Sequence, residues 1–407
     1  MSGGDDQAGP DLAAYAAAHD LLRVCRHADV IAVSTDPSNF CSSQGVLVTD
    51  PPRSPGDGPP PTLLHSDPPQ HTRYRRLVQP AFTPAVTRAL EPAIRGRVRT
   101  LLAVIDQDPT ASFDAVAALS LPLPLAVIAD LLGIDNSPAT LTRLATWSDA
   151  AVPGATDLPD SQRHQLMGEC FGYLVGIAKS RRDAAASSAS ADASAPADVI
   201  SRLAAATVDG ERLSDAELAM FLVQLLVAGN ETTRHSLSGG LLALAEHPEE
   251  WRRLRADRSL VPSAVEEILR WTAPVRHFLR TATGDATVAG CPVGAGRKVL
   301  LDYRAAGFDA GCADLGDLPD RAELADLAVF DVGRVDNPHL AFGFGPHFCL
   351  GAPLARLELR VVLEELLDRY SALQLAGAPT WNGSPVVYGL RTLPLRVTPV
   401  VRGESTL

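Results

Sequence analysis

The stretch of sequence that decides the fold is Phe342-Gly343-Phe344-Gly345-Pro346-His347-Phe348-Cys349-Leu350-Gly351, which precedes a helical pattern over residues 352–370. Its glycines and proline predict a tight loop that leads directly into a helix. Cys349 then lies where the free N–H groups of a first helical turn and the helix dipole stabilise an anion. Such surroundings lower the pKa of a thiol, and the thiolate is the form that binds a metal. The alternative, a buried structural cysteine in a glycine-rich turn, is the commoner one for a lone cysteine.

A second unusual block lies inside a long helix predicted over residues 214–246. Some 30 residues make a helix of about 45 Å, which is long enough to cross a whole domain. Its middle reads Ala228-Gly229-Asn230-Glu231-Thr232-Thr233, so polar groups interrupt an apolar rod. Ala228 and Thr232 share one face, where the threonine hydroxyl can bond the carbonyl four residues back. Because burying Glu231 costs free energy, the block indicates a functional site; a core helix that tolerates a glycine is the alternative.

The cysteine loop resembles the haem-ligand signature of the cytochrome P450 family, Phe-x-x-Gly-x-His-x-Cys-x-Gly, and residues 342–351 fit it at every fixed position. The likeness continues in scattered blocks over roughly residues 63–396. It implies a mainly α fold with a small β portion, and haem b (iron protoporphyrin IX) between two long helices. It also implies that Cys349 is the axial ligand of the iron, where a thiolate favours O–O cleavage.

The block at 228–233 resembles the oxygen-activation motif of the same family. The resemblance implies that Thr232 hydrogen-bonds the bound oxygen molecule and steers its protonation, while Glu231 passes protons inward. It further implies a set of residues around the haem and its propionates, which need cationic partners. These residues are His71, Arg75, Ala228, Gly229, Arg280, Phe342, His347 and Gly351. Taken singly, a histidine or arginine of this kind is more often a solvated surface residue. A role in binding the propionates is favoured only because all four occur at the positions that the family's pattern gives them.

Three further residues resemble the family's structural trio. Glu267 and Arg270 are three apart on a predicted helix and can form a partly buried pair, although most such pairs are solvated contacts. Arg334 falls where the family places the third member. The resemblance implies that the trio supports the haem loop rather than reacting.

Composition limits the function classes. The 407 residues are 46% hydrophobic, which allows a sizeable core and excludes a disordered chain. A net charge of −12 disfavours nucleic-acid binding. No stretch is long and apolar enough to predict a membrane span, and the first ten residues are no secretory signal. Six cysteines without CxxC pairs argue against disulfides and zinc. We therefore expect a cytoplasmic protein with no membrane partner.

The pattern along the chain predicts one catalytic domain over residues 11–407, after a disordered N-terminus at 1–10. Residues 12–33 are predicted to be largely helical. Helices are predicted over residues 69–82, 84–106, 123–132, 141–152 and 161–182, and a hairpin over 385–397. Proline and glycine at 49–61 predict a long loop, and the polar run 184–197 predicts a flexible one. An acidic stretch over 310–326 is extra relative to the family.

The resemblance implies a monooxygenase that inserts one oxygen atom from O2 into a hydrophobic small molecule, either a steroid or lipid or a secondary metabolite. Electrons would come from NAD(P)H through ferredoxin and ferredoxin reductase. Arg73, Arg76, Arg356 and Arg360 form either a basic docking face for an acidic ferredoxin or a plain solvated face, and the sequence leaves both open. The expected pocket lining is residues 46–64, 222–228, 275–279 and 386–390. A haem-thiolate enzyme that performs oxidative coupling or desaturation is the alternative, and a non-catalytic haem sensor is a more distant one.

Overall fold

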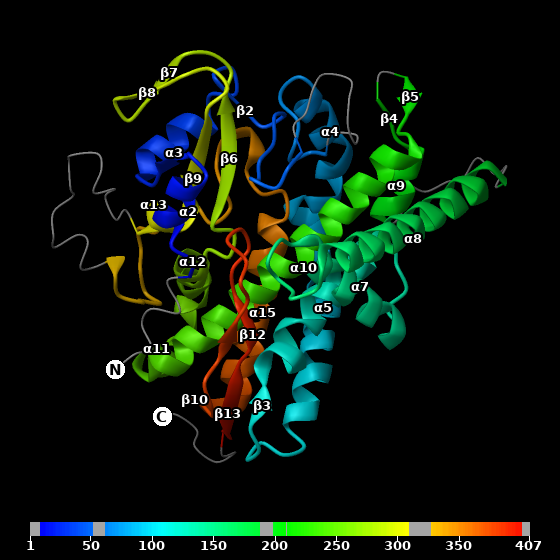
Figure 1. Cartoon of the computed structure of the whole chain (residues 1–407). Coiled ribbons are helices and arrows are strands. Elements are labelled where there is room, and N and C mark those ends of the chain that lie inside the picture. Colours follow the sequence, from blue (N-terminus) through cyan, green and yellow to red (C-terminus); the bar gives the residue numbers. More distant parts are fainter. Residues whose placement is uncertain (1–8, 52–61, 188–197, 209, 309–326, 401–407) are drawn as a thin grey trace.

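The computed structural model describes residues 9–51, 62–187, 198–208, 210–308 and 327–400 (Figure 1). Six predictions fall partly or wholly outside these ranges: the N-terminus 1–10, the catalytic domain 11–407, the pocket segment 46–64, the proline-rich loop 49–61, the polar run 184–197 and the acidic stretch 310–326. Within the polar run, residues 184–187 belong to helix α8 rather than to a loop.

Helices dominate the described chain, which confirms the predicted fold class. The α-helices are α2 (Leu12–Ala18), α3 (His27–Ser34), α4 (Gln70–Val78), α5 (Pro84–Ile105), α6 (Pro122–Leu132), α7 (Pro138–Ala151), α8 (Asp160–Ser187), α9 (Val199–Ala205), α10 (Asp215–Glu246), α11 (Pro248–Ala256), α12 (Val261–Thr272), α13 (Tyr303–Gly307) and α15 (Ala352–Arg369). Short helical turns are η1 (Gln79–Phe82), η2 (Val116–Ser120), η3 (Arg258–Leu260) and η4 (Gly345–His347).

The strands are short. They are β1 (Leu22–Val24), β2 (Phe40–Cys41), β3 (Phe113–Asp114), β4 (Thr207–Val208), β5 (Glu211–Arg212), β6 (His277–Ala282), β7 (Ala286–Val288), β8 (Cys291–Val293), β9 (Lys298–Asp302), β10 (Tyr370–Leu375), β11 (Thr380–Trp381), β12 (Leu390–Thr392) and β13 (Pro394–Pro399). The largest sheet has the order β1-β9-β6-β2, and a second has the order β10-β13-β3.

Helix α10 organises the helical part of the molecule. It begins after a capping box, in which the Glu217 N–H donates to the Ser214 hydroxyl at 3.2 Å and the Ser214 N–H donates to the Glu217 carboxylate at 2.8 Å. Figure 1 shows α10 running diagonally through the molecule, and it contacts α6, α7, α8, α12 and α15. A polar group in its middle is therefore surrounded by protein on most sides.

The four-stranded sheet places one site residue. Strand β9 pairs in parallel with β1 and antiparallel with β6, and Arg280 of β6 lies opposite Val299 of β9. On its other side, β6 pairs with β2. Figure 1 shows this sheet beside α2 and α3, away from α5, α7 and α8. Arg280 is thus fixed on an inner strand, and it is buried.

The segment 12–33 is largely helical, as predicted, although the short strand β1 lies between α2 and α3 and is held by its pairing with β9. One predicted element, the hairpin at 385–397, is wrong. Strand β12 pairs with β11, and β13 pairs with β10 and β3. Only Leu393 separates β12 from β13, whereas a hairpin turn needs at least two residues.

The cysteines differ from the prediction at one position. Cys25 is disulfide-bonded, whereas Cys41, Cys170, Cys291 and Cys349 are free. Local spacing of cysteines did not reveal this bond, because a disulfide joins residues that are close in space rather than in sequence. Among the described helices, none is both long and apolar enough to cross a membrane.

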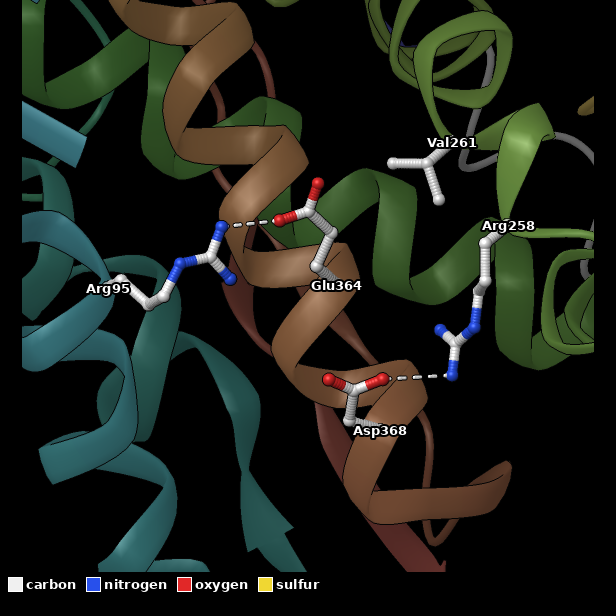
Figure 2. Close-up of a pocket in the computed structure, with 5 residues that line it drawn as sticks. All are labelled: Arg95, Arg258, Val261, Glu364 and Asp368. Carbon is white, nitrogen blue, oxygen red and sulfur yellow. Dashed lines mark hydrogen bonds and ion pairs between the residues drawn. The ribbon is translucent and has the colours of Figure 1, made fainter. Parts of the chain in front are cut away.

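A surface depression of about 270 Å³ lies where α15 meets α5 and η3, and it is lined by Arg95, Arg258, Val261, Glu364 and Asp368 (Figure 2). Figure 2 shows two of the ion pairs at the depression, from Arg95 to Glu364 and from Arg258 to Asp368. No predicted site residue lines it. This depression is therefore part of a contact between helices and not the candidate site.

Candidate haem and oxygen-activation site

The cysteine loop is closed by its own backbone. The Cys349 N–H donates to the Phe342 carbonyl at 2.9 Å, so the loop folds back on itself around η4. Helix α15 then begins at Ala352, with Gly351 as its N-cap residue. The cysteine therefore lies just before a helix N-terminus, as the sequence predicts.

The thiol of Cys349 does not have the lowered pKa that the sequence predicts. Burial raises the pKa of the thiol, and this effect outweighs the backbone N–H groups of Gly351 and Ala352 and the charges of Arg75 and Arg356, which lower it. Burial outweighs the helix N-terminus at Cys349 because a helix N-terminus carries only partial charges. A metal ion in contact with the sulfur would supply the full charge that favours the thiolate.

The four predicted propionate partners converge beside this loop. The ring centroids of His71 on α4 and His347 on η4 lie 4.3 Å apart. Arg75, one turn after His71, donates to the Pro346 carbonyl at 3.1 Å. Burial and then the nearby positive charges, including those of Arg75 and Arg280, lower the pKa of His71 to about 4 and that of His347 to about 2. Both imidazoles are therefore neutral beside two arginines.

This cluster suits a carboxylate ligand. The buried Nε2 of His71 has no hydrogen-bond partner within the described residues. Asp67, whose charge acts on His71, already accepts from the N–H groups of Ser42 at 2.8 Å and Ser43 at 3.0 Å. The Ser42 hydroxyl also lies 3.2 Å from Nε2 of His347. Donors in excess of local acceptors fit an incoming anionic group such as a haem propionate.

Helix α10 presents an open face at the predicted position. Ala228 is exposed although it lies mid-helix, while Asn230 is buried. The Thr232 hydroxyl donates to the Ala228 carbonyl at 2.7 Å, so the two residues share this face. Gly229 points elsewhere, because a Cβ there would lie 2.9 Å from Cδ1 of Ile128 on α6. The structure thus gives Gly229 a packing role, and its contact with a cofactor stays a prediction.

Glu231 lies in a buried polar network and is 1% exposed. Its Oε1 accepts from the Ser148 hydroxyl and from the Asn230 amide, each at 2.9 Å. Burial raises the pKa of Glu231, but the neighbouring His235 and the charge of Arg234 outweigh burial, so the pKa is lowered overall. The carboxylate is therefore ionised at neutral pH.

The network continues to helix α7. Nη1 of Arg234 lies 3.4 Å from the Glu231 carboxylate and donates to Asp149 at 2.8 Å. The pKa of Asp149 is raised, chiefly by burial. No hydrogen bond between Glu231 and Thr232 occurs in the part of the chain that is described here. The acid and the hydroxyl are thus neighbours on one helix with separate sets of partners.

The structural trio is assembled. Arg270 and Arg334 each donate from Nε to the fully buried carboxylate of Glu267, at 2.8 and 3.2 Å. The Arg334 side chain also donates to the Val329 carbonyl at 3.0 Å. The contact ties α12 to the segment that leads into the cysteine loop.

Four residues around these groups escaped the sequence reasoning: Ser42, Ser148, Arg234 and His235. Arg234 and His235 stand three and four residues after Glu231, so helical spacing was a usable signal for them. Ser42 and Ser148 are brought in from distant elements, and no local pattern points to them.

Comparison with known proteins places this geometry in a family. The family model described as Cytochrome P450 matches residues 156–310 and 329–390. The methyl-branched lipid omega-hydroxylase of Mycobacterium tuberculosis (strain ATCC 25618 / H37Rv) is 35% identical over 393 residues, which cover 95% of this chain and 86% of that protein. The steroid C26-monooxygenase of Mycobacterium tuberculosis (strain CDC 1551 / Oshkosh) is 35% identical over 373 residues, which cover 91% of this chain and 93% of that protein.

A solved structure agrees with these relatives. Cytochrome P450 CYP268A2 of Mycobacterium marinum, in complex with pseudoionone, superposes with a TM-score of 0.78 at 34% identity, covering 92% of this chain and 86% of that one. Haem b is the cofactor of this family, and its named members here are monooxygenases. This chain belongs to the cytochrome P450 family and is a haem-thiolate monooxygenase.

Proposed function

We propose that this enzyme hydroxylates a methyl-branched or steroid-like lipid. The observation that carries the proposal is one apolar cluster that joins all four segments expected to line the substrate pocket. Its members are the buried Val152, Ala155, Val386 and Val387, with Leu47, Val227 and Phe278 packed against them and only partly buried. Partly buried apolar side chains that four segments bring together suit a hydrophobic ligand. The names of the two mycobacterial relatives, a branched-lipid hydroxylase and a steroid monooxygenase, support this substrate class.

We assign Cys349 as the iron ligand, and His71, Arg75, Arg280 and His347 as the groups that hold the propionates. When bound, haem supplies the iron at which O2 is activated. The chain itself supplies protons and orientation. Thr232 holds its hydroxyl proton on the open face of α10, against the Ala228 carbonyl. Because Glu231 is ionised and buried, it can accept a proton inside the protein and pass it toward that face.

The electron donors belong to the same proposal. We infer NAD(P)H, ferredoxin reductase and ferredoxin as the source of electrons, in the cytoplasm, with no nucleic-acid or membrane partner. The experiment is reduction of the purified enzyme by NADPH with and without a bacterial ferredoxin and its reductase. Reduction that proceeds equally well without ferredoxin would overturn this part.

The haem assignment is tested by the carbon monoxide difference spectrum of the reduced enzyme. We expect the spectrum of a thiolate-ligated haem in the wild type and its loss in Cys349→Ala. Cys170→Ala is the matched control, because Cys170 is a free, buried cysteine outside the cysteine loop. An unchanged spectrum in Cys349→Ala would refute the ligand.

The substrate class is tested by spectral titration of the haem-loaded enzyme with phytanic acid and with cholestenone. Palmitic acid is the unbranched control. We expect a branched lipid or the steroid to displace iron-bound water at a lower concentration than palmitic acid, and isotopically heavy O2 to label one hydroxyl of the product. Equal binding of all three lipids, or a product without the label, would refute the proposal.

A further inference from the structure

A second carboxylate of α12, next to the one that holds the structural trio, binds side chains around the cysteine loop. Glu266 accepts from Nε of Arg356 at 2.7 Å and from Nη2 of the same guanidinium at 2.8 Å, so the pair is bidentate. Its Oε2 also lies 3.2 Å from Nε2 of His339. Glu266 therefore connects α12 with α15 and with the segment that leads into the cysteine loop.

The two contacts of His339 determine its tautomer. The backbone N–H of Ala341 donates to Nδ1 of His339 at 3.2 Å, so Nδ1 carries no proton. The N–H of the ring is then on Nε2, where it donates to the Glu266 carboxylate. Arg356 and His339 are thus both donors to Glu266, and their hydrogen bonds can form at the same time.

The flat face of the Arg356 guanidinium covers Phe342, the first residue of the cysteine loop. Cζ of Arg356 lies 4.6 Å from the centroid of the Phe342 ring, a distance at which a cation is attracted to an aromatic face. The Phe342 ring meets Phe348 edge-on, and the Phe342 carbonyl accepts from the Cys349 N–H. Arg356 binds Glu266 with its edge and Phe342 with its face, so the two contacts are compatible.

The charges of this pair act beside the sulfur. Burial raises the pKa of the Cys349 thiol, and the charge of Arg356 is among the effects that lower it. Burial also raises the pKa of Glu266, but hydrogen bonds from Arg356 and His339 outweigh burial and lower it to about 2. Glu266 is therefore ionised at neutral pH and offsets the charge of Arg356.

Removing either member of the pair would change the net charge beside the sulfur. Reduction adds one electron to the haem, so a net positive charge near its ligand favours the reduced form and a net negative charge disfavours it. The side chains of Arg356 and Glu266 are 37% and 31% exposed, and solvent therefore screens part of the effect. A moderate effect of opposite sign follows for the two residues.

We propose that the Glu266–Arg356 pair sets the reduction potential of the haem bound through Cys349. Arg356 places a positive charge over Phe342 beside the sulfur, Glu266 offsets that charge, and His339 holds Glu266 in place. The inference rests on the assignment of Cys349 as the iron ligand proposed above. Arg356, Glu266 and His339 are positioning residues, and the inference gives them no contact with substrate.

The test is a potentiometric titration of the haem-loaded enzyme without substrate. At the solution potential where the wild type is half reduced, we expect the ratio of reduced to oxidised haem to rise about threefold in Glu266→Gln, because Arg356 loses its counter-charge. In Arg356→Gln the ratio should fall by about the same factor, since Glu266 is then unbalanced. The double variant Glu266→Gln/Arg356→Gln should return to the wild-type ratio.

Glu364→Gln is the matched control. The side chain of Glu364 is 31% exposed, as that of Glu266 is, and it also pairs with an arginine of α15, Arg360, at 2.9 Å. Because Arg360 lies one turn further along α15 from Cys349, the ratio should stay at the wild-type value. Arg356→Lys keeps the positive charge but not the planar pair of donors, and it should change the ratio less than Arg356→Gln does.

A carbon monoxide difference spectrum of each variant shows whether the thiolate ligand is retained. A wild-type ratio in Glu266→Gln with an intact thiolate spectrum would overturn the inference and leave the ligand assignment standing. A change of the same sign in both single variants, or an equal change in Glu364→Gln, would also overturn it. If Cys349→Ala keeps the thiolate spectrum, the ligand assignment itself fails, whatever the ratios show.

Discussion

Arg270 binds both carboxylate oxygens of Glu267, with Nη2 to Oε1 and Nε to Oε2 each at 2.8 Å. Both side chains are at most 1% exposed. The same carboxylate also accepts from Arg334 at 3.2 Å and from the Asn337 amide at 3.0 Å. A buried charge is tolerated only when it is paired and fully hydrogen-bonded, and this carboxylate meets both conditions.

Removing this carboxylate should be costly. In Glu267→Ala, two buried guanidinium groups lose their charged partner, and we expect the free energy of unfolding to fall by about 3–5 kcal/mol. Glu364→Ala is the matched control, because Glu364 also pairs with arginines but its side chain is 31% exposed. For such a pair the loss is about 1 kcal/mol or less. Guanidinium chloride unfolding of both variants measures the difference, and equal losses would contradict the structural role.

Thr232→Ala should separate oxygen consumption from product formation. Ala228 and Thr232 share the open face of α10, and of these two residues Thr232 alone carries a hydroxyl, which the variant loses. We expect NAD(P)H consumption to continue while product per NAD(P)H falls by about tenfold or more and hydrogen peroxide is released. Thr232→Ser keeps the hydroxyl and should stay close to the wild type. If Thr232→Ala gives unchanged yield with a turned-over lipid, Thr232 has no part in proton delivery.

The elements that sequence predicts well here depend on local chemistry. The capping box at Ser214 and Glu217 is visible within four residues, and it starts α10 as predicted. The glycines and proline before Cys349 likewise mark a loop that leads into α15. Strand β1 behaves differently, because its pairing with β9 depends on residues far along the chain. Local pattern therefore predicts the segment 12–33 as largely helical and does not reveal the strand inside it.

The residues of the candidate site also divide into those that local sequence reveals and those that only the packed fold brings together. Glu231 and Thr232 were visible as polar residues in an apolar helix, yet Ser148, which holds Glu231, comes from another helix. The pKa of Cys349 was predicted from the helix N-terminus alone, whereas burial decides its direction. Burial is a property of the packed fold, and a loop sequence does not contain it.

Glu365 makes the stability of the enzyme depend on acid pH. Burial raises the pKa of Glu365, but hydrogen bonds from Arg99, Arg369 and Arg95 outweigh it and lower the pKa to about 2. The folded pKa lies below the ordinary value, so the stabilisation is fully present above about pH 4.5 and is lost as the pH falls toward about 2. We expect Glu365→Gln to be less stable than the wild type near neutral pH, with a difference that shrinks on acidification. Denaturant midpoints measured across this range test it, and a pH-independent difference would contradict it.

The arginines expected to dock ferredoxin are not equivalent. Arg356 donates to both oxygens of Glu266, at 2.7 and 2.8 Å. Arg360 is paired with Glu91 at 2.6 Å and with Glu364 at 2.9 Å. Both charges are thus largely balanced within the protein.

Arg76 lies exposed on α4, and we expect it to contribute more to docking than Arg356 or Arg360. An exposed charge steers a partner over a distance that salt shortens, whereas an internally paired one contributes little to the long-range field. Arg76→Ala should therefore slow ferredoxin-driven reduction at low ionic strength, with an effect that fades as salt is added. Arg360→Ala, the matched control, should change the reduction rate less and the stability more. Stopped-flow reduction across a salt series measures this order, and an equal loss of rate in both variants would show that the internal pairs of Arg360 do not shield its charge.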